Sequence, residues 1–148
     1  MVMFAPLLAL GIAAGVTLGP TTPSTTISLS DEHRQTCGLV VRNASKAPVQ
    51  IWFAAFWPNH RMTMKDASGK PVGLTPFGKA VTLMFGGGRD KNSPFTIEPG
   101  KSYRYPTQSL VKAFELRPGA YTLSVVYEDK SFGKPLLLSC SMHVKVVK

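Results

Sequence analysis

The chain has 148 residues, 44% of them hydrophobic, and carries a formal charge of +9 at neutral pH. This length favours one domain, and the hydrophobic content excludes a largely disordered chain. The 17 basic residues are scattered, whereas nucleic-acid-binding proteins usually concentrate their charge on one element, so we expect no nucleic acid partner. The charge indicates either a soluble surface or attraction to an anionic lipid, a cell-wall polymer or an acidic partner.

Residues 1–19 carry no charge and precede a polar stretch at 20–26. This pattern predicts a secretory signal peptide, with Ala13 and Gly15 as the small residues of its cleavage site, followed by a linker. The segment lacks the usual lysine or arginine, and its length is close to that of a membrane anchor. The alternatives are an uncleaved anchor, which would be the only membrane contact, or a buried strand or helix. We expect a secreted or periplasmic protein whose domain spans residues 27–148.

Short alternating runs separated by turn residues follow along the domain. We expect strands at residues 25–30, 37–43, 49–57, 60–66, 95–97, 102–105, 121–127 and 136–147. The runs at 95–97 and 102–105 are expected to form a hairpin-like pair. Residues 109–115 are the only helix candidate, because Ser109 can cap a helix. Seven or eight short strands with regularly spaced turns predict an all-β sandwich with one short helical turn.

Residues 116–127 give the clearest fold signal, because a Pro-Gly turn precedes strict alternation. The alternation predicts one buried face, made by Tyr121, Leu123, Val125 and Tyr127. In the last strand, Cys140 and Met142 are expected to face inward, and His143 and Lys145 outward.

The sequences of four predicted turns resemble those of a known family of domains. The turns at 43–49, 66–70, 97–101 and 116–121 resemble those of bacterial exported immunoglobulin-like and fibronectin-III-like domains, over residues 25–147. The resemblance implies an immunoglobulin-like β-sandwich with a tyrosine corner, in which the Tyr121 hydroxyl bonds back to nearby backbone. Leu123 stands where an antibody-type domain has its second disulfide cysteine.

Cys37 and Cys140 are the two cysteines of the chain. In an oxidising compartment such a pair predicts one disulfide bond, and the alternative is two buried thiols. Neither cysteine belongs to a CxxC motif, which argues against a catalytic or redox role.

Aromatic residues at the end of the third expected strand are the first candidates for a binding site. Trp52, Phe56 and Trp57 lie close in sequence, and alternation predicts that Trp52 and Phe56 share a face. Exposed aromatic rings stack on sugars or anchor protein partners, whereas covered ones belong to a core. The glycines Gly86, Gly87 and Gly88 are expected to form a mobile loop beside these rings.

His60, Met62 and Met64 project to one face of the fourth expected strand. Imidazole and thioether ligands together suit Cu(I), so a small periplasmic copper-binding protein is an alternative. Methionines on an alternating strand more usually fill a core.

The sequence contains no GxSxG, HExxH or CxxC motif, and its acidic residues are spread out. This favours a protein without enzymatic activity. We expect a binding or structural module without a cofactor, which presents loops or a sheet edge to a protein or a cell-envelope polymer. A protease-inhibitor-like sandwich is a further alternative.

Overall fold

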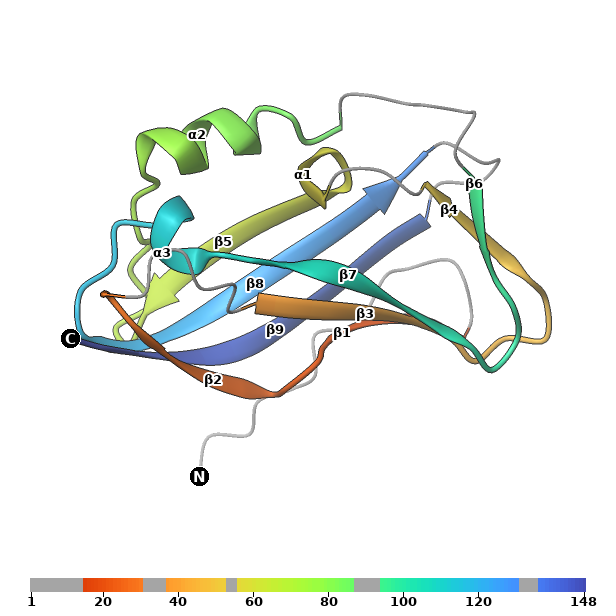
Figure 1. The fold of residues 1–148 in the computed structure, drawn as a ribbon, viewed down its shortest axis with the longest axis horizontal. Helices are drawn as coiled ribbons and strands as arrows, with labels where there is room; N and C mark the ends of the chain where they lie inside the picture. The colour runs from red at the N-terminus through yellow and green to blue at the C-terminus, as the bar shows by residue number, and fades with distance from the viewer. Residues whose placement is uncertain (1–14, 31–36, 53–55, 87–93, 131–135) are drawn as a thin grey trace.

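The computed structural model describes residues 15–30, 37–52, 56–86, 94–130 and 136–148, without the side chains of Trp52, Pro94, Pro106 and Thr107. These residues are mostly β-structure (Figure 1). The strands are β1 (Val16–Pro20), β2 (Ser24–Ser28), β3 (Cys37–Asn43), β4 (Val49–Trp52), β5 (His60–Asp66), β6 (Pro94–Ile97), β7 (Ser102–Gln108), β8 (Gly119–Asp129) and β9 (Leu136–Val147). The helices are α1 (Phe56–Asn59), α2 (Pro76–Thr82) and α3 (Leu110–Ala113).

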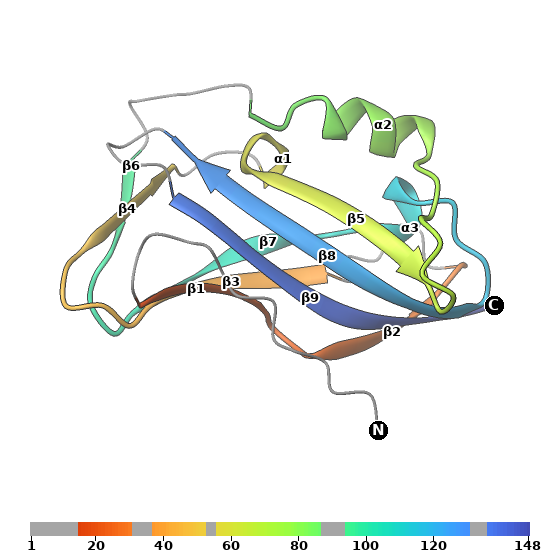
Figure 2. The ribbon, with the colours of Figure 1, turned by 180° about the vertical axis from the view of Figure 1, so that it is seen from behind.

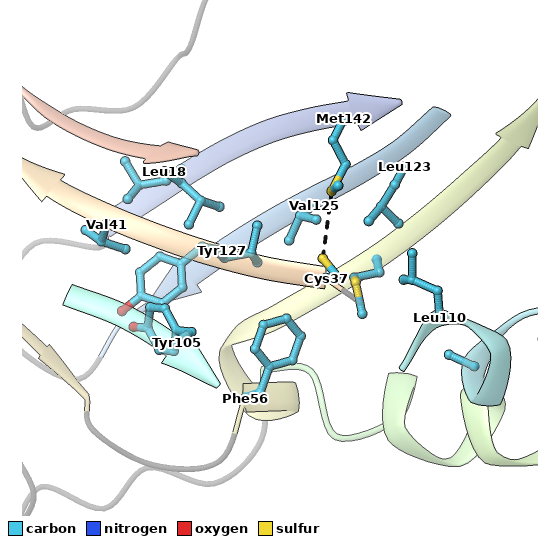
Figure 3. Close-up of a cluster of buried hydrophobic side chains, with 14 of the residues drawn as sticks. Leu18, Cys37, Val41, Phe56, Tyr105, Leu110, Leu123, Val125, Tyr127 and Met142 are labelled. Atoms are coloured by element: carbon cyan, nitrogen blue, oxygen red, sulfur yellow. Dashed lines mark hydrogen bonds between the residues drawn. The ribbon is translucent and has the colours of Figure 1, made fainter. Parts of the chain in front are cut away.

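Two sheets form the body of the fold. One has the strand order β1-β3-β7 and the other the order β2-β9-β8-β5, while β4 and β6 form a small separate sheet at one end (Figures 1 and 2). The apolar sides of the two larger sheets meet in one core, part of which Figure 3 draws. The expectation of a mostly β fold built from several sheets is therefore confirmed.

Alternation in β8 and β9 explains how the four-stranded sheet covers this core. Leu123 is fully buried and lies in register between Met64 on β5 and Met142 on β9. Burying a side chain of this size stabilises the fold by roughly 1.5–3 kcal/mol. The bounds predicted for β3, β5 and β9 agree with the structure, because strict alternation identifies half-buried strands well.

The segment from Val16 to Ser28 belongs to both sheets. Strand β1 pairs antiparallel with β3, and β2 pairs parallel with β9. Residues 24–26, which the sequence predicts as linker, are thus part of β2. The end of the predicted signal segment is strand β1, because Val16 and Leu18 alternate with exposed or half-buried neighbours and enter the core.

The third expected strand is shorter than predicted. It ends at Trp52, and Phe56 and Trp57 lie in the helical turn α1, so the prediction of a strand through residue 57 is wrong. The shared strand face predicted for Trp52 and Phe56 is not formed either. Pro58 fits this turn because the first residues of a helix need no intrahelical N–H donor.

One predicted strand pairing is corrected, and the predicted helix is shorter than expected. Strands β6 and β7 do not pair with each other, since β6 pairs with β4 and β7 with β3. The predicted helix at residues 109–115 is confirmed in the shorter α3, where the Ser109 hydroxyl accepts a bond from Lys112 N. Helices α1 and α2 and strand β1 are the elements that the sequence analysis missed.

Candidate functional site

Large apolar side chains remain exposed where α1, α2 and the turn after α2 meet. We call this group the aromatic surface; it consists of Trp57, Phe77, Leu83, Met84 and Phe85. Phe77 is 43% exposed, Met84 44% and Leu83 86%, and the other two are half-buried. Soluble proteins seldom leave such a group of side chains uncovered unless it contacts a partner.

Local sequence determines where α2 begins. The Thr75 hydroxyl accepts a hydrogen bond of 3.0 Å from Gly78 N, and Pro76 opens the helix. This pairing of a hydroxyl cap with proline is favourable at a helix start. The Thr75 hydroxyl also donates to the Lys112 carbonyl, which ties α2 to α3.

Glycine residues bring the aromatic surface against the rest of the fold. A Cβ atom on Gly78 would lie 2.0 Å from the Ala113 carbonyl oxygen, so only glycine allows α2 and α3 to approach this closely. After α2 the chain turns at Gly86, which has a φ of +78°. Gly86 N donates a bond of 2.9 Å to the Pro58 carbonyl and so places the residues before it beside α1.

Ring contacts connect the aromatic surface to the core. Trp57 packs edge-on against exposed Phe77, with centroids 6.4 Å apart, and against buried Phe56, with centroids 5.1 Å apart. Cations lie over two rings: the Arg61 guanidinium is 5.1 Å from the Phe85 centroid, and the Lys112 ammonium is 5.6 Å from that of Phe77. The surface therefore combines fixed aromatic rings with positive charge.

The structure separates the residues of the predicted aromatic site. Trp57 lies on the aromatic surface and Gly86 lies beside it, but Phe56 is buried in the core. The side chain of Trp52 and the glycines Gly87 and Gly88 lie outside the described part of the chain. Sequence reasoning missed Phe77, Leu83 and Met84, although the Thr75–Pro76 cap in front of an apolar run was a usable signal.

His60, from the predicted copper site, lies in a buried polar cluster with Tyr105, Tyr127 and Asp129. Its Nδ1 donates a 2.7 Å bond to the Phe56 carbonyl, and its ring stacks on the Phe56 ring at 4.0 Å. The opposite nitrogen, Nε2, is buried and has no hydrogen-bond partner among the described residues. Tyr127 donates to Asp129, and Figure 3 shows Tyr105, Tyr127 and Phe56 side by side. Burial lowers the pKa of His60 to about 4, against the opposing effect of the Phe56 bond, so the imidazole is neutral at pH 7.

Met62 and Met64 face the core from β5, on the same side as His60. The shared face predicted for the three residues is therefore present, and both methionines are 2% exposed. In the described residues, no three histidine, cysteine, aspartate or glutamate side chains gather into a metal-binding group.

Both cysteines are free thiols in the structure. The Cys37 thiol donates to the Met142 sulfur at 3.9 Å, and Figure 3 shows this contact between the sheets. Burial, with a smaller effect from the Cys140 thiol, raises the pKa of Cys37 to about 12, and burial raises that of Cys140 to about 11. Both are therefore protonated and weakly nucleophilic at neutral pH.

The Tyr121 hydroxyl bonds to the Arg117 backbone in both directions. It accepts from Arg117 N at 3.2 Å and donates to the Arg117 carbonyl at 2.8 Å, at the start of β8. This is the backbone bond that the sequence analysis predicts for a tyrosine corner.

In comparisons with known proteins, no family model and no curated protein matches this sequence. Among the described residues, none of the helices has the length and apolar character needed to cross a bilayer. Proposals about function therefore start from the aromatic surface and from the other surfaces of the fold.

Proposed function

We propose that this chain is an exported, non-enzymatic binding module that docks a protein partner on the aromatic surface. The observation that carries the proposal is the exposure of Phe77, which packs on Trp57, together with that of Leu83 and Met84 in the turn after α2. Aromatic rings and methionine are enriched at the centres of protein interfaces, where they bury a large area. A cell-envelope polymer that stacks on Trp57 is the alternative partner.

Charge supports a protein partner that presents an apolar side chain next to an acidic one. Arg61 and Lys112 lie over rings of the aromatic surface. Each retains a positive charge that can attract a carboxylate at the rim of the interface. Leu83 and Met84 offer adaptable apolar contacts, which suit a protein side chain better than a sugar ring.

We also propose the immunoglobulin-like assignment and export. The Tyr121 corner and the facing sheets support the first. For the second, cleavage after Gly15 would leave β1 complete, since this strand begins at Val16. A mature chain starting there would keep Val16 and Leu18 in the core.

Selection from a displayed library of random peptides tests the docking proposal. We expect the folded protein to select peptides that combine an apolar anchor with an acidic residue. The double variant Leu83→Ser and Met84→Ser should bind these peptides at least about tenfold more weakly.

The matched control is Leu137→Ser, which also removes an exposed leucine, but from β9. This variant should bind the peptides as the unchanged protein does. Equal binding by the double variant would contradict docking on the aromatic surface. Retention of the protein on insoluble polysaccharides, with Trp57→Ala abolishing it and no peptide selected, would identify the polymer instead.

A second candidate, Cu(I) binding, is favoured by the buried nitrogen of His60. Its Nδ1 donates to a carbonyl, while Nε2 has no partner in the described part of the chain, an arrangement typical of histidines that ligate metals. Met62 and Met64 on the same face would supply thioether ligands. Titration of the reduced protein with Cu(I) against a competing chelator tests this function, and a failure to compete at micromolar metal would eliminate it.

A further inference from the structure

A second surface, which adjoins the aromatic surface only at Arg61 among the described residues, lies on the outer face of the sheet β2-β9-β8-β5. Figure 2 views the molecule from the side of this sheet. Outward positions on the four strands carry mostly hydroxyl groups and basic side chains: Ser24, Thr26, Arg61, Thr63, Lys65, Thr122, Ser124, Ser139, Ser141, His143 and Lys145. Among the described residues of this face, the only acidic side chain is Glu128, which forms a 2.6 Å ion pair with Lys130. The face is therefore positively charged and rich in hydrogen-bonding groups.

One end of this face is hollowed. The hollow has a volume of about 580 Å³ and is lined from the outer face by Ser24, Thr26, Ala120, His143 and Lys145, together with their chain neighbours. This volume is in the range of small-ligand sites, about 300–1,000 Å³. None of the exposed large apolar side chains of the described residues lines the hollow.

Strand register explains why basic side chains and hydroxyls alternate across the hollow. His143 on β9 lies between Ser24 on β2 and Thr122 on β8. One step along, Lys145 lies between Thr26 and Ala120. Neighbouring strands are about 4.8 Å apart, so His143 and Lys145 each lie within reach of a hydroxyl on a neighbouring strand. Ala120 has a short side chain and leaves the space that the hollow occupies.

These groups fit one class of ligand best. A lysine ammonium attracts a sulfate, phosphate or carboxylate group, and serine and threonine hydroxyls exchange hydrogen bonds with the hydroxyls of a sugar. A protein interface would need a desolvated apolar centre. Single-stranded nucleic acid would favour exposed aromatic rings for base stacking. Among the described residues, the outward positions around the hollow carry no exposed apolar cluster, and the one aromatic residue that lines it, Tyr121, is half-buried.

We propose that the hollow and the hydroxyl rows beside it bind an acidic polysaccharide. An anionic group of the polymer contacts Lys145 and His143 in the hollow, and adjoining sugars lie over Thr122 and Ser124. Lys65, in register with Thr122 on the far edge strand, offers a second cation to the chain. This inference does not rest on the docking proposal, because no residue of the aromatic surface lines the hollow.

Binding of heparin, alginate and neutral dextran to the full chain tests the proposal. We expect the two acidic polymers to bind and dextran to give no signal, with binding that weakens as salt is added. Lys145→Glu should weaken acidic-polymer binding at least about tenfold, and Lys145→Gln should weaken it less. Thr26→Val should weaken it about threefold through the lost hydroxyl.

The matched control is Lys101→Glu, which makes the same charge change on an exposed lysine of the turn between β6 and β7. This variant, and the double variant of Leu83 and Met84, should bind acidic polymers within about twofold of the unchanged protein. An equal loss with Lys101→Glu would overturn the proposal, because it would indicate general charge attraction. Tighter binding to single-stranded DNA or to phosphatidylglycerol vesicles than to either acidic polymer would also overturn it.

Discussion

The four-stranded sheet and the layer formed by α2 and α3 are stabilised in different ways. In the sheet, buried side chains alternate along β5, β8 and β9, so the apolar contribution is shared by many residues. In the helical layer, the backbones of Gly78 and Ala113 touch, and the Thr75 hydroxyl bridges the two helices. The stability of the sheet is thus distributed, whereas that of the helical layer depends on a few atoms.

The same contrast separates the two proposed surfaces. The aromatic surface needs α2 at a fixed distance from α1, because Trp57 and Phe77 meet there. The hollow is built from the regular register of β2, β9 and β8. Disturbing the helical layer should therefore impair the first surface and spare the second.

The largest expected effect comes from Gly78→Ala. Its Cβ would overlap the Ala113 carbonyl, and neither backbone can move without separating α2 from α3. We expect a loss of about 3 kcal/mol in the free energy of unfolding, measured by urea denaturation. Gly73→Ala is the control, since its Cβ would meet only the flexible side chain of Glu115. A cost for Gly78→Ala no greater than that of the control would show that the close approach is not needed.

A smaller effect is expected from pH, at the end of the sheet where His60 is buried. Its pKa is about 4 in the folded chain and about 6.5 when exposed, so the unfolded chain binds the proton more tightly between these values. The contribution is fully present above pH 6.5 and is lost as the pH falls towards 4. Between pH 7 and pH 5 the metal-free protein should lose about 2 kcal/mol through this group.

Comparison with His60→Phe isolates this contribution, because the variant keeps a ring stacked on Phe56 but has no titrating group. The unfolding free energy of the unchanged protein, minus that of the variant, should decrease as the pH falls from 7 to 5. Parallel stability curves over this range would contradict the neutral, buried imidazole.

Tyr121→Phe should have the smallest effect. It removes both hydrogen bonds to Arg117 while the ring stays in place. We expect a loss of about 1 kcal/mol, because these bonds are exposed to water. Thermal unfolding of this variant and of the unchanged protein, measured side by side, checks this value. Identical unfolding midpoints would show that the hydrogen bonds of Tyr121 to Arg117 do not contribute to stability.

Sequence predicted the parts of the fold that follow a local pattern. Strand β8 could be predicted because Leu123, Val125 and Tyr127 fall at alternate positions of one face, and α3 because Ser109 is a good cap. Helix α1 could not, because Phe56 and Trp57 have high strand propensity and only tertiary contacts with His60 and Phe77 place them in a turn.

The two candidate surfaces could not be predicted from local sequence patterns, because they depend on contacts between distant parts of the chain. Trp57 was identified from its residue type, but the exposure of Leu83 and Met84 depends on the return of the chain at Gly86 to α1. The hollow requires the pairing of Ser24 with His143, residues far apart in the sequence. A parallel pairing of this kind leaves no signal in either strand alone.

The parallel pairing of β2 with β9 also has a mechanical consequence. The paired residues run from Ser24 opposite His143 to Ser28 opposite Val147. Leu29 N extends the pairing with a 3.1 Å hydrogen bond to the Val147 carbonyl. Tension that pulls β2 from its first residue and β9 from its last displaces the strands along their length. The evenly spaced bonds then share the load and must break together instead of one by one. A module tethered through these two strands would resist being pulled open.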